Sequence, residues 1–220
     1  MCRVSAVTRW SWRHGKIMHH TIFETPIINT LMRGLSRLLL RASGWRTEGM
    51  TPAQIAAYPK YVLIAAPHTS NWDAPFTLMV CFQLQLKVYW MAKASLFAWP
   101  IRWLSRWLGG IAVDRSVSNN TVQNTIAAFA ARERLAVIVA PEGTRGKVTH
   151  WKTGFYHIAH GAGVPIALAY LDFARKAGGI ARMFITTGDI AADMAEIQAF
   201  YSGITGKNPH QFDPDTIKRG

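Results

Sequence analysis

The stretch Tyr61-Val-Leu-Ile-Ala-Ala-Pro-His-Thr-Ser-Asn-Trp-Asp73 joins an apolar run to a polar segment. Residues 61–66 are continuously apolar and Pro67 closes the run, a pattern typical of a strand buried on both faces of a sheet. Ser70 and Asp73 then precede the apolar stretch Ala74–Val80 with the spacing of a helix-capping box. The stretch therefore predicts a buried strand followed, after a short polar turn, by a helix.

The same alternation of apolar strands and helical segments continues along the chain. Apolar strands that alternate with helices indicate an α/β fold, here with a mostly parallel or mixed sheet flanked by helices. A length of 220 residues suits a single domain of this kind. We expect further strands at Val88–Met91, Ile111–Val113, Ala136–Ala140, Pro165–Tyr170 and Met183–Thr187, and helices at Asn119–Arg134, Thr153–His160 and Ile190–Tyr201.

Three regions follow from this pattern. Residues 1–47 form a basic N-terminal tail and an amphipathic helix, 48–205 form the α/β domain, and 206–220 form a loose C-terminal tail. The tail from Gly206 is expected to be loose because it contains Pro209 and Pro214.

The N-terminal region is strongly basic. Residues 27–42 place leucines at helical spacing on one face and Arg33, Arg37 and Arg41 on another, the pattern of a helix lying in a membrane interface. An ordinary surface helix packed on the core fits the same pattern. Residues 1–47 hold eight Lys and Arg against the single Glu24, a net charge of +7.

Composition narrows the class of partner. The net charge of +13 requires an anionic partner, either a membrane surface or a nucleic acid, and nine Trp favour the membrane interface. No apolar run reaches about 18 residues, so we expect no membrane-spanning helix. Cys2 and Cys81 suggest neither a disulfide framework nor a metal site, which fits a reducing compartment.

His68 and Asp73 are the first candidate catalytic pair. A carboxylate that orients an imidazole and stabilises its protonated form is how a general base is built. His68 also falls at the carboxyl end of a predicted strand, where ligand sites in open α/β sheets lie. The alternative is a structural histidine beside a helix-capping aspartate.

Two more strand ends carry polar residues. Pro141-Glu142-Gly143-Thr144-Arg145 offers a flexible backbone, a hydroxyl and a guanidinium that matches phosphate, although a Glu142–Arg145 ion pair in a polar turn is the alternative. Gly110-Ile-Ala-Val-Asp-Arg115 likewise ends on an arginine, which a surface Asp–Arg pair would also explain.

These three segments, in this order, resemble the ordered blocks of the glycerolipid acyltransferases typified by 1-acyl-sn-glycerol-3-phosphate acyltransferase. His68-Thr-Ser-Asn-Trp-Asp73 matches the His-x4-Asp block, and Val164-Pro-Ile166 is similar to the fourth block. The resemblance covers roughly residues 60–170. It implies that His68 and Asp73 are catalytic. It also implies that the acceptor phosphate is bound by Arg115, Glu142, Gly143, Thr144 and Arg145. Lys93 is a further candidate for binding the acceptor.

The resemblance implies an enzyme that moves an acyl group from an acyl thioester, on coenzyme A or acyl carrier protein, to a lysophospholipid hydroxyl. It implies no metal and no redox cofactor, and backbone N–H groups near Gly143 as candidates to stabilise the oxyanion. We expect a peripheral enzyme at the cytoplasmic face of the cell membrane, with anionic lipids as partners and no nucleic acid.

Three rival functions remain open. The acceptor could be a lyso-aminolipid or another alcohol. A non-enzymatic basic protein that binds membranes or nucleic acid would explain the charge, although no nucleic-acid-binding module is apparent. The third is hydrolysis, with water in place of the lipid hydroxyl, although a serine-hydrolase route is disfavoured because the chain has no Gly-x-Ser-x-Gly motif.

Overall fold

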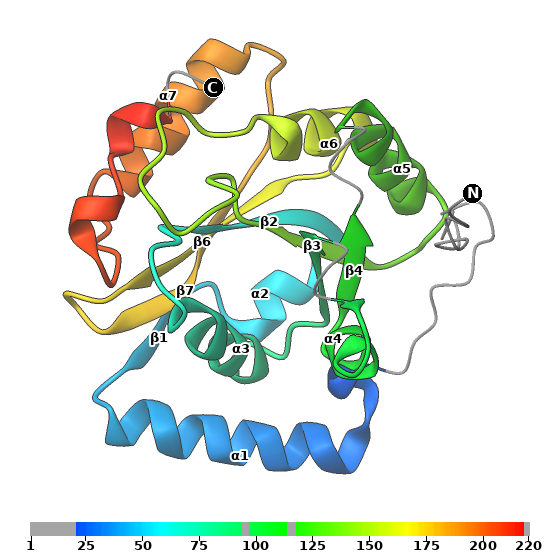
Figure 1. Cartoon of the computed structure of the whole chain (residues 1–220), viewed down its shortest axis with the longest axis vertical. Coiled ribbons are helices and arrows are strands. Elements are labelled where there is room, and N and C mark those ends of the chain that lie inside the picture. The colour runs from blue at the N-terminus through cyan, green and yellow to red at the C-terminus, as the bar shows by residue number, and fades with distance from the viewer. Residues whose placement is uncertain (1–20, 94–96, 114–117, 218–220) are drawn as a thin grey trace, which may run out of the picture.

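Strand β2 (Lys60–Ala66) runs through the middle of a seven-stranded sheet (Figure 1). The computed structural model describes residues 21–93, 97–113 and 118–217. The side chains of β2 alternate between the two faces of the sheet, with Val62 and Ile64 in one hydrophobic core and Tyr61 and Leu63 in the other. The other strands are β1 (Arg46–Gly49), β3 (Val88–Lys93), β4 (Gly110–Val113), β5 (Leu135–Val139), β6 (Ile166–Asp172) and β7 (Ala177–Phe184).

The sheet is mixed. Its strand order is β1-β7-β6-β2-β5-β3-β4. Neighbours from β6 to β4 pair in parallel, β7 is antiparallel to β6, and β1 is parallel to β7. The predicted α/β class and mixed sheet are therefore confirmed.

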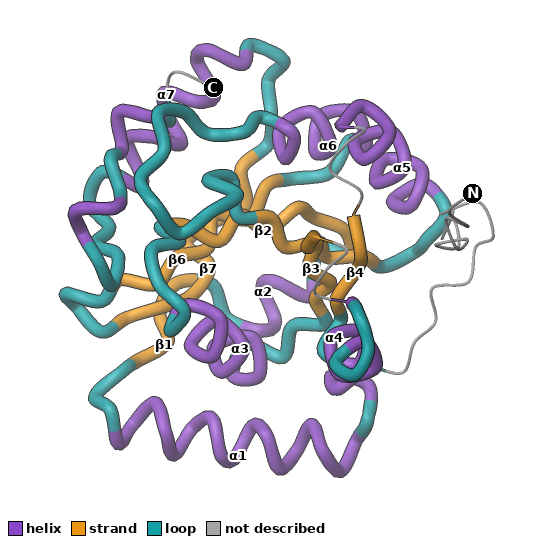
Figure 2. Tube along the Cα trace, in the orientation of Figure 1, coloured by secondary structure: helices purple, strands orange, loops and turns teal. Residues whose placement is uncertain are grey.

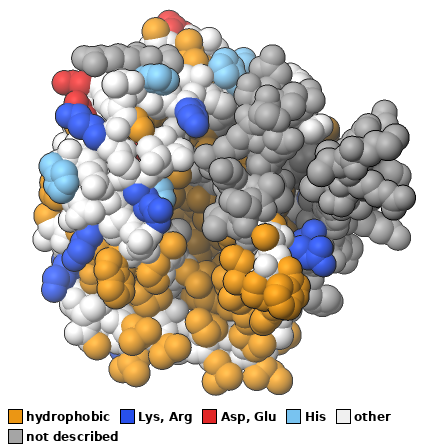
Figure 3. Space-filling model, in the orientation of Figure 1, with side chains coloured by type: hydrophobic (Ala, Val, Ile, Leu, Met, Phe, Trp, Pro, Cys, Tyr) orange, Lys and Arg blue, Asp and Glu red, His pale blue; other side chains and the backbone are white. Residues whose placement is uncertain are grey.

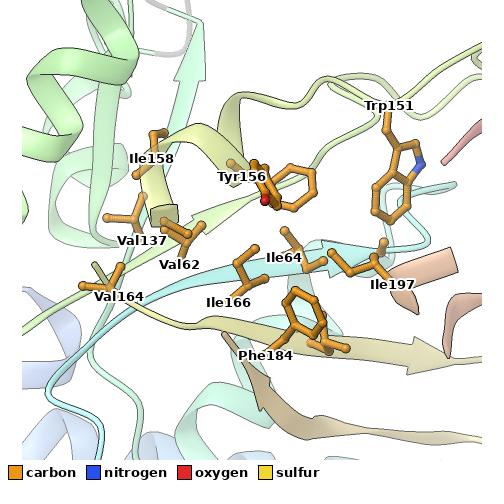
Figure 4. Close-up of a cluster of buried hydrophobic side chains, with 14 of the residues drawn as sticks. Val62, Ile64, Val137, Trp151, Tyr156, Ile158, Val164, Ile166, Phe184 and Ile197 are labelled. Carbon is orange, nitrogen blue, oxygen red and sulfur yellow. The ribbon is translucent and has the colours of Figure 1, made fainter. Parts of the chain in front are cut away.

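Helices cover both faces of the sheet (Figure 1). The helices are α1 (Pro26–Ala42), α2 (Pro52–Ala56), α3 (Asp73–Gln83), α4 (Arg102–Trp107), α5 (Ser118–Ala130), α6 (Gly154–Ala162) and α7 (Ile190–Tyr201), with short 3-10 turns η2 (Ile22–Glu24), η4 (Pro209–Gln211) and η5 (Pro214–Thr216). Residues of α5, α6 and α7 pack on Val62, Ile64 and Ile166 in the core of Figure 4. Residues of α1, α2 and α3 pack on the opposite face.

Two strands at the β1 end of the sheet differ from the sequence predictions, since β1 was not predicted at all and β7 was misplaced. Strand β7 begins at Ala177 and ends at Phe184, whereas the predicted strand Met183–Thr187 overlaps it by two residues only. The apolar pattern failed here because Gly178 and Gly179 open the strand, and glycine disfavours strands. A Cβ on Gly179 would lie 1.9 Å from the Glu48 carbonyl oxygen, so the neighbouring strand β1 requires this glycine.

The tail after residue 205 is not loose, contrary to prediction. Ile217 and Thr216 are buried, and Ile217 belongs to the core beneath α6 and α7. The backbone N–H of Trp151 donates to the Thr216 carbonyl oxygen at 3.2 Å. Pro209 and Pro214 each begin a 3-10 turn, so the prolines shape the segment rather than free it.

Helix α1 is both amphipathic and packed. Ser36 and Leu40 are buried against the rest of the protein, and the helix packs along α3. Its apolar outer face stays exposed, as the exposed fractions of Ile27 (76%), Leu31 (66%) and Leu38 (64%) show. Within the described residues, no helix is long and apolar enough to cross a bilayer.

Candidate active site

The carboxyl ends of β2 and β5 bring two polar loops together. Residues 67–72 follow β2, residues 140–153 follow β5, and these loops lie side by side (Figure 2). Parallel neighbouring strands end at the same edge of a sheet, which is why segments so distant in sequence meet. Both loops contribute to the candidate site.

His68 and Asp73 are in contact. His68 Nδ1 lies 3.1 Å from Asp73 Oδ2, and the same oxygen accepts hydrogen bonds from the backbone N–H groups of Thr69 (2.7 Å) and Ser70 (2.8 Å). Asp73 is 4% exposed, whereas the His68 side chain is 30% exposed. The carboxylate is thus fixed by buried donors, and it leaves the other ring nitrogen of His68, Nε2, on the far side of the imidazole.

Asp73 also begins helix α3, and its carboxylate reaches back to the turn before it. The two alternatives for Asp73 are therefore compatible. The same carboxylate bonds to the turn before the helix and orients the His68 imidazole. A carboxylate in the first turn is favoured there by the helix dipole. Because Asp73 is the first residue of α3, the position of the helix fixes where the Asp73 carboxylate meets His68.

Glu142 lies behind His68 rather than in the cavity. Its Oε1 accepts a hydrogen bond from the His68 backbone N–H at 3.0 Å, and Oε2 is buried with no hydrogen-bond partner. Burial raises the pKa of Glu142 to about 7, although the hydrogen bond from His68 opposes the shift. The side chain is 5% exposed and does not line the cavity, and its observed contact is with the loop that contains His68.

Arg145 reaches the other loop. Its guanidinium donates to Asn71 Oδ1, and no Glu142–Arg145 ion pair occurs in the described part of the chain. Arg145 and Thr144 are exposed at the cavity that His68 also lines. Gly143 has φ +65°, which favours glycine, and its N–H donates to the Ala140 carbonyl oxygen. That N–H is therefore not available to stabilise an oxyanion.

Two predicted site residues lie at the margin of what the structure describes. Arg115 is outside the described residues. Lys93 ends strand β3, next to β4, so its backbone is at the same sheet edge as the two loops.

A large cavity connects the polar site to the core. Its volume is about 1280 Å³, and its wall includes His68, Asp73, Thr144 and Arg145. Most of the remaining wall is apolar, including Leu63, Val80, Cys81, Leu86, Val88 and Ile180. Such a cavity suits a ligand with one polar end and a long apolar chain.

Sequence reasoning missed several residues around the site. Lys152 lines the cavity, and a Cβ on Gly143 would lie 3.0 Å from its Nζ. Asn208 and Gln211, from the predicted loose tail, hydrogen bond to the loop after His68. No local pattern marks these residues, because their contacts are made across the fold.

Among the described residues, no group of three or more His, Cys, Asp or Glu could hold a metal ion. Fold and site together define an α/β protein in which a histidine–carboxylate pair and an exposed arginine share one largely apolar cavity.

Comparison with known proteins agrees with that class. The sequence profile of the family described as Acyltransferase matches residues 51–170, more than half of the chain. The chain therefore belongs to the acyltransferase family.

Individual relatives carry the name 1-acyl-sn-glycerol-3-phosphate acyltransferase. That of Salmonella typhimurium is 31% identical over 130 residues, 56% of this chain and 51% of the relative. That of Haemophilus influenzae is 31% identical over 106 residues, 45% of this chain and 42% of the relative. The chain spans about half the length of the curated relatives it matches.

A solved structure shares the fold. The 1-acyl-sn-glycerophosphate (LPA) acyltransferase PlsC from Thermotoga maritima matches with a TM-score of 0.55 and 17% identity, over 79% of this chain and 76% of that one. At this identity the likeness establishes the architecture alone.

Proposed function

We propose that this protein transfers a fatty acyl group from an acyl thioester to the free hydroxyl of 1-acyl-sn-glycerol-3-phosphate, giving phosphatidic acid. The observation that carries the proposal is that the His68–Asp73 pair and Arg145 lie on the wall of one largely apolar cavity. The acyl chains require apolar enclosure and the acceptor phosphate requires a cation. Membership of the acyltransferase family supports the same reaction.

In the proposed mechanism, His68 is the general base. Its Nε2 takes the proton of the acceptor hydroxyl while Asp73, bonded at Nδ1, stabilises the imidazolium. The hydroxyl oxygen forms a bond to the thioester carbonyl carbon. The carbon–sulfur bond then breaks, and the thiolate leaves and receives the proton back from His68.

The cations at the cavity position the acceptor. Arg145 offers a planar set of donors that matches phosphate, and Asn71 holds its guanidinium beside the His68 loop. Lys152 provides a second positive charge near Gly143. Holding the phosphate fixes the distance between hydroxyl and base, which is a positioning contribution. We assign Glu142 to supporting the His68 backbone and Gly143 and Thr144 to the cavity wall; Arg115 and Lys93 remain candidates for the same phosphate.

The proposed reaction uses the acyl thioester, on coenzyme A or acyl carrier protein, as a co-substrate and needs no metal or redox cofactor. The proton moves from the acceptor hydroxyl to His68 and then to the leaving thiolate, so His68 is the only side chain that the proposed proton transfers require.

We propose that the protein works at the cytoplasmic face of the cell membrane as a peripheral protein. Supporting this, hydrophobic side chains gather on the lower part of the face in Figure 3, where α1 and α4 lie. Trp99 and Trp103 are 89% and 69% exposed, and Arg33, Arg37 and Arg41 lie along α1. An apolar helix face beside tryptophans and arginines suits an interface with anionic lipids.

The test is a product assay with purified protein. Acyl-CoA or acyl carrier protein thioester is offered with lysophosphatidic acid, a lyso-aminolipid, or monoacylglycerol, and products are identified by mass spectrometry. The proposal expects phosphatidic acid as the main product. Exclusive acylation of an acceptor without phosphate, or thioester hydrolysis alone, would contradict it.

A further inference from the structure

Residues 206–217, which we call the C-terminal clasp, fold over the base of both site loops. The segment contains η4 and η5 and follows helix α7. Gly206 lies against the loop after β2, because a Cβ there would be 2.8 Å from Thr69 Oγ1 and 3.2 Å from Pro67 Cβ. The clasp thus begins in direct contact with the residues on either side of His68.

Asn208 fastens the clasp to Thr69. Its backbone N–H donates to Thr69 Oγ1 at 3.1 Å, and its Nδ2 donates to the Thr69 carbonyl oxygen at 2.8 Å. Thr69 in turn donates its own N–H to Asp73 Oδ2. The residue between His68 and the Asp73 carboxylate is therefore held from both sides.

Gln211 joins the two loops to each other. With its amide nitrogen facing the loops, Nε2 lies 2.6 Å from the Thr69 carbonyl oxygen and 2.6 Å from the Arg145 carbonyl oxygen. An amide nitrogen has two hydrogens and can satisfy both acceptors at once. One side chain therefore connects the backbone beside the His68 loop to the backbone of the exposed arginine.

The far end of the clasp is anchored in the core. Ile217 is fully buried, Gln198 Nε2 of α7 donates to Asp215 Oδ1 at 2.8 Å, and the backbone N–H of Trp151 donates to the Thr216 carbonyl oxygen. Lys147 Nζ lies 3.7 Å from Asp213 Oδ2. The clasp is thus tied to the folded body on one side and to both loops on the other.

We propose that the C-terminal clasp is part of the active site, with Asn208 and Gln211 as positioning residues that keep His68 and Arg145 in fixed positions relative to each other. Neither residue lines the cavity, so each acts through a loop: Asn208 through Thr69, and Gln211 through Thr69 and Arg145. The inference rests on the proposed function for its effect on catalysis, while its effect on loop order is independent of any substrate.

Different contacts predict different kinetic effects. Displacing a catalytic group by about 1 Å can reduce the rate about 100-fold. Of the two loops, Asn208 hydrogen bonds only to the one that contains His68. Asn208→Leu should therefore lower kcat about 10-fold and leave the acceptor KM within about two-fold. Gln211 also holds Arg145, so Gln211→Met should lower kcat and raise the acceptor KM about five-fold or more.

The variants are chosen to separate positioning from folding. Leu and Met approximate the sizes of Asn and Gln without their donors and without adding charge. His210→Gln is the matched control, because His210 is exposed in the same turn η4 and its side chain makes no hydrogen bond or ion pair within the described part of the chain. Thermal unfolding of each variant gives the temperature below which it is fully folded, and all assays are run there.

Hydrogen exchange supplies the second measurement. In Asn208→Leu and Gln211→Met, the backbone amides of residues 68–73 should exchange at least about five-fold faster than in the His210→Gln control, while those of α7 stay unchanged. This follows if the clasp orders the loop locally. Because this readout needs no substrate, it tests the clasp even if the wild-type protein does not transfer acyl groups. Folded variants with control-like exchange in residues 68–73, or faster exchange with unchanged kcat, would overturn the proposal.

Discussion

The Glu142 carboxylate accepts a hydrogen bond from the backbone N–H of His68 at 3.0 Å, from a position 74 residues away in sequence. The bond joins the two loops at the residue proposed as the base. It also buries a carboxyl group whose second oxygen has no partner, which raises its pKa to about 7. A support of this kind should leave a signature in the pH dependence of stability.

Glu142→Gln should remove a pH-dependent destabilisation. The pKa of Glu142 is raised from 4.5 to about 7, so between these values the folded state binds more protons than the unfolded state. The contribution of Glu142 to stability therefore falls as pH rises through that window, by on the order of 3 kcal/mol. Urea unfolding of wild type and variant at pH 5, 6.5 and 8 measures the difference. A difference in unfolding free energy that is constant with pH would count against the buried carboxylate.

Arg145→Ala should weaken binding of a phosphate-bearing acceptor. Loss of a charge-assisted hydrogen bond costs about 1.5–3 kcal/mol, so the acceptor KM should rise about 10- to 100-fold. Monoacylglycerol, which lacks the phosphate, should show no such change in steady-state kinetics. Equal effects on both acceptors would show that Arg145 does not contact the phosphate.

Gly179→Ala should destabilise the sheet edge. The added Cβ would lie 1.9 Å from the Glu48 carbonyl oxygen, so β1 must move away from β7. We expect a loss of roughly 1–3 kcal/mol in unfolding free energy, as for other overpacked positions. Gly146→Ala, where a Cβ meets nothing within 4 Å, is the control. If the two variants have the same free energy of unfolding, β1 does not approach Gly179 as closely as the structure indicates.

Leu31→Ser combined with Leu38→Ser should weaken binding to anionic vesicles. Both leucines lie on the exposed apolar face of α1, and burying a leucine contributes about 1.5–3 kcal/mol. Cosedimentation with phosphatidylglycerol vesicles should fall at least about 10-fold, whereas Ile185→Ser, at an exposed residue outside α1 and α4, should bind as wild type. Unchanged binding in the double variant would move the interface elsewhere.

The sequence predicted what local patterns encode. The continuous apolar run of β2 and the spacing of Ser70 and Asp73 place His68 at a strand end, and the structure agrees. An apolar run closed by a proline also predicted strand β5 and the polar turn after it. Strand β7 did not, because its two glycines are explained only by the neighbouring strand that they admit.

Long-range contacts were beyond sequence reasoning. Arg145 was expected to pair with Glu142 or bind phosphate, and its observed partner Asn71 lies 74 residues away. Asn208 contacts Thr69 across 139 residues, in a segment whose prolines suggested disorder. A single sequence shows which residues are polar, but not which loops the fold brings together.

The most direct test of the central claim is acyl transfer by His68→Ala, measured with acyl-CoA and lysophosphatidic acid. His157→Ala, an exposed histidine on α6 that does not line the cavity, is the matched control. If His68 is the base, kcat should fall at least about 100-fold in His68→Ala while the melting temperature and the His157→Ala activity stay near wild type. Turnover by a folded His68→Ala protein within about two-fold of the control would contradict the account.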